Sequence, residues 1–123
     1  MISLELVTTP SEGLREMIRS RMWRRTQQTR EESEAIVQSE TIGLIQGMLV
    51  EMMAAADIAE KAAPVRAFEL VGLCPQHFSL LALFGDLDAV TTALEAITQQ
   101  LKPVEWLRRD RKGQVTPEVR ARL

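Results

Sequence analysis

The sequence predicts an α+β domain built on one sheet. Short segments rich in β-forming residues, some with strictly alternating polarity, are interleaved with longer segments that repeat apolar residues every three or four positions. In chain order they predict strand, helix, polar linker, strand, helix, strand, strand and helix. The chain has 123 residues, which is enough for one domain with a modest core.

The first strand and the first helix are predicted at the N-terminus. Residues 2–7, ISLELV, alternate apolar and polar side chains as a half-buried strand does. The run Thr9-Pro10-Ser11 ends this strand, and the Ser11 side chain can cap a helix. We therefore treat residues 2–23 as a strand–helix unit. The helix should place four apolar side chains on one face: Leu14, Met17, Ile18 and Met22.

Residues 24–38 are polar and carry many charges of both signs. This composition fits either a solvated helix or a linker, and the pattern does not decide between them. The segment is treated as a linker in the division of the chain.

A second strand and a second helix follow the polar segment. Residues 40–46, ETIGLIQ, predict the strand, in which Gly43 and Gly47 either weaken the pairing or mark a close backbone approach. Residues 49–63 are rich in alanine and methionine, which are strong helix formers. Pro64 ends the helix. We expect three methionines to fill the core or an interface: Met48, Met52 and Met53.

Two further strands and a last helix complete the predicted domain. The runs RAFELVG (66–72) and FSLLALF (78–84) flank the short loop CPQH and predict a hairpin. Gly85-Asp86 then turns the chain into an amphipathic helix over residues 87–101. This helix should bury Val90, Leu94 and Ile97. The resulting arrangement is close to the ferredoxin-like one, with residues 40–101 as its core.

The last segment, residues 102–123, differs from the rest in charge. It holds seven basic and three acidic residues, a net charge of +4, whereas the whole chain carries −2 and residues 1–101 therefore carry −6. No clear strand–helix pair is evident in it. We divide the chain into a domain over 1–101 and a basic extension over 102–123. Either a solvated terminus or a segment docked on an acidic surface fits this charge.

The composition argues against several classes of function. A net charge of −2, few aromatic residues and no tyrosine do not favour nucleic acid as a partner. No apolar run is long enough to span a membrane, and the N-terminus lacks the basic start of a signal peptide. The single cysteine excludes a disulfide within the chain. We therefore expect a cytoplasmic protein.

The only cysteine and the only histidine, Cys74 and His77, lie together in the stretch VGLCPQHF. A lone cytosolic cysteine is usually a small buried apolar residue, and His77 taken alone fits a polar hairpin end. The chain contains no nucleophile–base pair, no glycine-rich phosphate loop and no zinc spacing. The sequence therefore predicts that the protein is not an enzyme.

Residues 40–97 resemble the bacterial microcompartment (BMC) shell domain. Its G-L-I strand, A-A-D-x-x-x-K-A-A helix and G-D turn match Gly43-Leu44-Ile45, residues 55–63 and Gly85-Asp86. Residues 2–22 resemble the opening of circularly permuted members, in which a strand and a helix from the end of the domain stand first. The resemblance implies a permuted domain joined through residues 24–38. Pro64 departs from the family, which often has asparagine there.

The stretch between the third and fourth strands matches the pore loop of this family. Its G-x-C-P-Q-H motif is similar to that of the shell protein of glycyl-radical propanediol microcompartments, and the matching residues are Gly72, Cys74, Pro75, Gln76 and His77. The resemblance implies a homohexamer whose pore holds an iron–sulfur cluster, which would pass electrons or clusters across the shell. Cys74 would be the metal ligand. A [4Fe–4S] cluster usually takes four thiolates, so several subunits would share it.

The other matched residues have implied roles as well. Gln76 and His77 would donate hydrogen bonds to the cluster, or His77 would itself be a ligand. Lys61 matches the lysine at which neighbouring shell proteins meet, although a solvated lysine also fits. Two other functions stay open. One is a shell hexamer whose metal-free pore passes a metabolite, and the other is an unrelated α+β regulatory oligomer.

Overall fold

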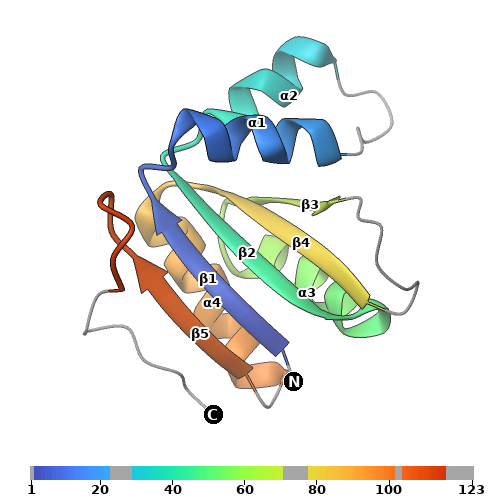
Figure 1. Cartoon of the computed structure of the whole chain (residues 1–123). Helices are drawn as coiled ribbons and strands as arrows, with labels where there is room; N and C mark the ends of the chain where they lie inside the picture. The colour runs from blue at the N-terminus through green and yellow to red at the C-terminus, as the bar shows by residue number, and fades with distance from the viewer. Residues whose placement is uncertain (1, 23–28, 71–77, 102–103, 116–123) are drawn as a thin grey trace.

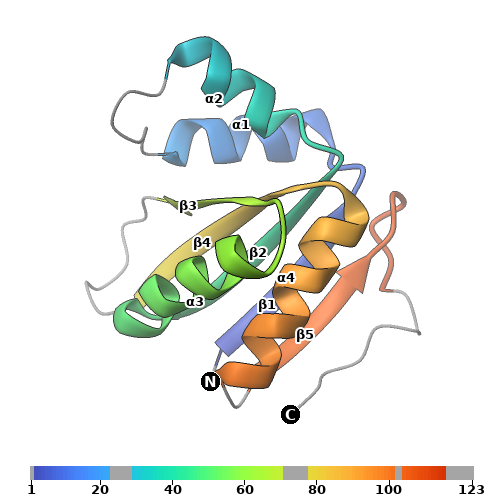
Figure 2. The same cartoon turned by 180° about the vertical axis from the view of Figure 1, so that it is seen from behind.

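The computed structural model of the chain describes residues 2–22, 29–70, 78–101 and 104–115. These residues form one five-stranded sheet, in the order β3-β4-β2-β1-β5, with helices on both of its faces (Figures 1 and 2). The α+β prediction is confirmed. In chain order the elements are β1 (Ile2–Thr8), α1 (Glu12–Arg21), α2 (Arg30–Val37), β2 (Thr41–Met48), α3 (Leu49–Ala62), β3 (Arg66–Leu70), β4 (Phe78–Gly85), α4 (Leu87–Gln100) and β5 (Val104–Arg109).

The sheet is mostly antiparallel. Strand β2 pairs antiparallel with both β1 and β4, and β3 pairs antiparallel with β4. Leu4, Ile45 and Leu81 lie opposite one another across the three central strands and are buried on the same face. The alternating pattern of residues 2–7 thus reflects a strand that buries every second side chain.

Helices α3 and α4 cover one face of the sheet and form the larger core with it (Figure 2). Val90, Leu94 and Ile97 are fully buried, as predicted. A Cβ atom on Gly43 would lie 3.0 Å from Val90 Cγ1, and one on Gly47 would lie 3.0 Å from Met52 Cε. Both glycines therefore mark close approaches between β2 and the helices on this face.

Helices α1 and α2 form a hairpin on the opposite face of the sheet (Figure 1). Ile18 is buried there with Phe68 and Phe84, whose rings meet edge to face at 5.8 Å. The predicted linker 24–38 thus contains a helix over residues 30–37, which Thr29 caps by accepting the backbone N–H of Glu32. Residues 24–28 lie outside the described part.

The predicted apolar face of the first helix is only partly correct. Leu14 and Met22 pack against the cluster around Ile18, but the Met17 side chain is 58% exposed. Arg15 is buried in its place and donates hydrogen bonds to the backbone carbonyls of Val37 and Ser39. A guanidinium with backbone partners thus takes part in the contact between the two helices.

Strand β5 shows that the sheet continues beyond residue 101, the predicted end of the domain. The strand runs parallel to β1, with Ile2 opposite Val104 and Val7 opposite Arg109. It is an edge strand, and edge strands often carry charged residues. Its composition therefore resembles that of a solvated tail. The boundary at 101 is therefore wrong, and at least residues 104–109 belong to the sheet.

Candidate functional site

The predicted pore-loop residues Gly72, Cys74, Pro75, Gln76 and His77 lie outside the described residues. The structure describes the frame that holds them. Strand β3 ends at Leu70, β4 begins at Phe78, and Leu70 pairs with Leu80. Both ends of segment 71–77 are therefore fixed at the same end of two neighbouring strands (Figure 1).

Side-chain hydrogen bonds brace this frame. The Ser79 hydroxyl is buried and donates to Glu69 Oε2 at 2.8 Å, which links β4 to β3 beside the segment. The backbone N–H of Ala67 donates to Glu60 Oε2 at 2.8 Å, which links β3 to α3. The sequence does not predict these contacts, because Glu60 and Glu69 show no pattern beyond that of exposed carboxylates.

An apolar surface adjoins the end of segment 71–77. Phe78 lies opposite Met48, the last residue of β2, and α3 starts at the next residue. Five large apolar side chains at this corner are each at least 41% exposed, and we call them the α3 apolar surface: Met48, Leu49, Val50, Met53 and Phe78. We expected three methionines in the core or in an interface. Of these, only Met52 lies in the core, where it is 2% exposed.

Within the described ranges, no group of three or more histidine, cysteine, aspartate or glutamate side chains could hold a metal ion. The same part of the chain contains no helix long and apolar enough to cross a membrane. The assignment of a metal to Cys74 thus stays a prediction.

A hollow of about 470 Å³ lies between α1 and α2; its lining residues are Arg19, Met22, Arg30, Ser33, Glu34 and Val37. Arg19 contacts Glu34 at 2.8 Å and Glu12 at 3.4 Å. Desolvation lowers the pKa of Arg19, but the hydrogen bonds and charges of Glu34 and Glu12 outweigh it and raise the pKa overall. Two carboxylates thus already partner this arginine, so the hollow makes a poor anion site.

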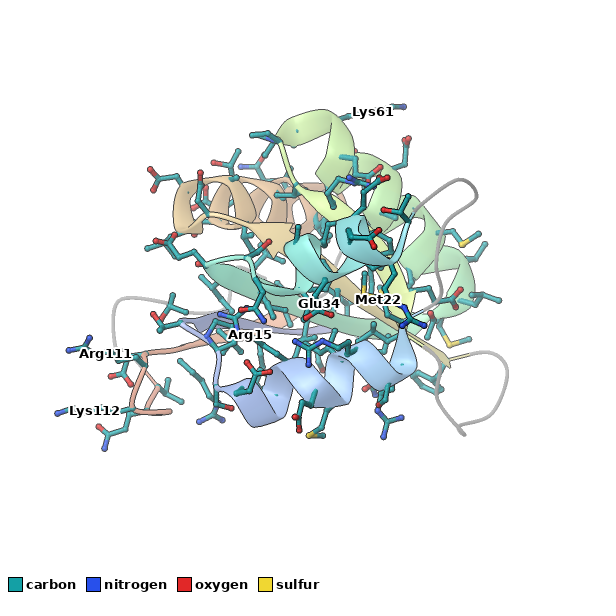
Figure 3. The ribbon with its side chains drawn as sticks, turned by 90° about the horizontal axis from the view of Figure 1, so that it is seen from above. Arg15, Met22, Glu34, Lys61, Arg111 and Lys112 are labelled. Carbon is teal, nitrogen blue, oxygen red and sulfur yellow. The ribbon has the colours of Figure 1, made fainter. Side chains whose placement is uncertain are left out.

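Lys61 lies near the C-terminal end of α3, away from the α3 apolar surface. Its side chain is 76% exposed and forms an ion pair of 2.8 Å with Asp57, one helical turn earlier. In Figure 3 it points away from the body of the molecule. Its position is thus open to a neighbouring molecule, which is what the resemblance requires of it.

Comparison with known proteins identifies the family. A family model described as the BMC domain matches residues 41–108, which is more than half of the chain. The chain therefore belongs to the BMC-domain family. The matched span includes segment 71–77 and most of β5, and this membership excludes the unrelated regulatory oligomer considered above.

Two solved structures are similar to this chain, and both are ligand-free structures of the GrpU microcompartment shell protein. The one from Clostridiales bacterium 1_7_47FAA is 28% identical, with a TM-score of 0.50, and the match covers 77% of this chain and 86% of that chain. The one from Pectobacterium wasabiae is 26% identical, with a TM-score of 0.56, and the match covers 77% and 98%. No curated protein matches the chain.

Proposed function

We propose that the chain is a shell protein of a bacterial microcompartment of the glycyl-radical propanediol type. In this proposal six copies form a ring, and Cys74 residues from several subunits bind an iron–sulfur cluster in its central pore. The observation that carries the proposal is the similarity to two microcompartment shell proteins over most of both chains. The G-x-C-P-Q-H motif adds the cluster, and the chain itself has no enzymatic role.

The chemistry of the cluster explains why a ring is needed. One chain supplies one thiol, whereas a [4Fe–4S] cluster usually takes four thiolates. A closed ring repeats the same segment around its axis and so supplies enough ligands. Six equivalent thiolates cannot all bind one cubic cluster, so some copies bind and others do not. Gln76 and His77 donate hydrogen bonds that tune the reduction potential, and the cluster passes electrons or whole clusters across the shell.

The proposal includes a circular permutation. The family match begins at residue 41, after β1 and α1. Strand β1 nevertheless lies inside the sheet, between β2 and β5. This supports the view that residues 2–22 are the strand and helix that close an unpermuted domain. In the assembled shell, which lies in the cytoplasm, Lys61 meets other shell proteins at the ring edge.

The test is iron binding by protein purified and reconstituted without oxygen. We expect wild-type protein to be brown, to absorb in the visible range and to contain iron and sulfide, whereas Cys74→Ser protein of the same oligomeric state is colourless. His77→Ala should keep the colour and shift the reduction potential, and loss of iron would instead make His77 a ligand. A colourless, iron-free wild-type ring would favour the metal-free metabolite pore.

A further inference from the structure

The chain turns back on strand β5 as soon as the strand ends. Strand β5 ends at Arg109, and Arg109 forms an antiparallel bridge with Val115. In the tight turn between them, the backbone N–H of Asp110 donates to the carbonyl of Gln114 at 2.9 Å, and Gly113 has a positive φ of 82°. A turn that pairs its two arms in this way starts a β-hairpin. The last described residues therefore form the first antiparallel pair beside the edge of the sheet.

The backbone of β5 has one side that faces away from β1. The carbonyl of Arg109 accepts the hydroxyl of Thr8 on β1 at 3.2 Å, whereas the next N–H along the chain is directed to the returning arm of the turn. Backbone groups alternate between the two sides of a strand, so the N–H and C=O groups of Trp106 and Arg108 point away from β1. Within the described residues, no strand lies along this side of β5. Such a row of backbone groups is a template for another strand.

The sequence after Val115 fits this template in register. The bridge between Arg109 and Val115 sets the pairing, in which position 116 would lie opposite 108, position 117 opposite 107 and position 118 opposite 106. Only every second pair of an antiparallel ladder exchanges hydrogen bonds, and the turn assigns these bonds to positions 116, 118 and 120. Pro117 has no N–H to donate, and it falls at a position that exchanges no bonds.

The length and composition of the same segment also fit. At least eight residues follow Val115, whereas β5 has six, so an extended segment reaches the far end of the strand. Thr116 and Val119 are β-branched residues, which favour strands. Proline and charged residues, here Glu118 and Arg120, are typical of a strand that forms the outer edge of a sheet.

We propose that residues 116–121 form a sixth strand, which pairs antiparallel with β5 and covers this edge of the sheet. The occupant of the edge is thus the chain's own C-terminal segment, and it keeps β5 from pairing with a strand of another molecule. The entropy of ordering the segment opposes the pairing more strongly as the temperature rises. The pairing therefore melts before the sheet does and changes the thermal midpoint little. The inference does not depend on the proposed function.

Residue-resolved hydrogen exchange at low temperature tests the pairing by comparing the full-length chain with a chain that ends after Val115. We expect the backbone amides of Trp106 and Arg108 to exchange about tenfold or more faster in the shortened chain, because their bonding partners are gone. The amides of Glu105 and Leu107 are the internal control. They face β1 and should exchange at the same rate in both chains.

Two proline variants of the full-length chain test the register. Glu118→Pro removes an N–H that would donate to β5, whereas Val119→Pro removes one that would point away from it. We expect Glu118→Pro to speed the exchange of the Trp106 amide and Val119→Pro to leave it nearly unchanged. Equal effects of the two variants would contradict the register and with it the inference.

Two outcomes of the comparison between the chains overturn the sixth strand. One is fast exchange of the Trp106 and Arg108 amides in the full-length chain, since the edge would then be open. The other is protection of these amides that persists in the shortened chain, because a neighbouring molecule would then cover the edge in place of residues 116–121. Measurements at several protein concentrations identify such a neighbour.

Discussion

The guanidinium of Arg15 on α1 donates a hydrogen bond of 2.9 Å to the backbone carbonyl of Ser39, just before β2. A second bond reaches the carbonyl of Val37, at the end of α2. Removing these donors leaves partly buried carbonyl oxygens without partners. We expect Arg15→Met to lower the free energy of unfolding by about 1–3 kcal/mol, measured by urea denaturation.

Arg19→Met is the matched control for this measurement. Arg19 lies one turn further along α1, but its partners are the exposed carboxylates of Glu12 and Glu34. Ion pairs of this kind contribute about 0–1 kcal/mol. If both variants lose the same stability, the buried backbone contacts of Arg15 do not have the role given to them here.

Two glycines offer a second matched pair. A Cβ atom on Gly43 would lie 3.0 Å from Val90 Cγ1 and 3.4 Å from Leu94 Cδ1, so these two buried side chains of α4 would have to move by a few tenths of an ångström. We expect Gly43→Ala to cost about 1–3 kcal/mol in a chemical denaturation experiment. A Cβ atom on Gly13, in the first turn of α1, would lie 4.0 Å from Ser11 Oγ, so Gly13→Ala should be neutral or stabilising by up to about 1 kcal/mol. A neutral Gly43→Ala would argue against close packing of α4 on β2.

Elements whose apolar pattern matches their burial could be predicted from the sequence. Strand β1 and helix α4 bury one face each, so alternation and helical spacing gave both within a residue or two of their observed ends. The short helix α2 could not be predicted, since Val37 is its only fully buried residue and the rest reads as solvated. Strand β5 was not predicted, because its pairing with β1 joins residues about 100 positions apart and no local pattern encodes such a pairing.

The candidate site shows a different limit. The motif at Gly72–His77 predicted iron–sulfur binding only through a family resemblance, because one thiol and one imidazole have no metal-binding spacing of their own. The α3 apolar surface was hidden by the same composition that predicted a strong helix. Methionine and valine at residues 48–53 fit a buried face as well as an exposed one, and only the exposed fractions distinguish the two.

Strand β5 leads to a prediction for shortened chains. Ending the chain after residue 101 removes β5, one of the two strands that pair with β1, and makes β1 an edge strand. We expect this deletion to cost more than about 2 kcal/mol of unfolding free energy, because it removes a full ladder of backbone hydrogen bonds. Ending the chain after Val115 keeps all the strands of the described residues and should leave the thermal midpoint nearly unchanged. Equal stability of the two shortened chains would contradict the place given to β5.

The last prediction concerns the edge of the proposed ring. Lys61 is 76% exposed, and among the contacts described it pairs only with Asp57, four residues earlier. An ion pair at this helical spacing contributes about 0.3–0.5 kcal/mol to the stability of the fold. We expect Lys61→Ala to leave the thermal midpoint and the oligomer mass nearly unchanged. If the proposed rings of the wild type assemble into extended layers, negative-stain electron microscopy should show none for this variant. Lys112→Ala, at an exposed turn after β5, is the control and should form such layers (Figure 3). Normal layers from Lys61→Ala would remove Lys61 from the contact between rings, and a loss of oligomer mass would place it within the ring instead.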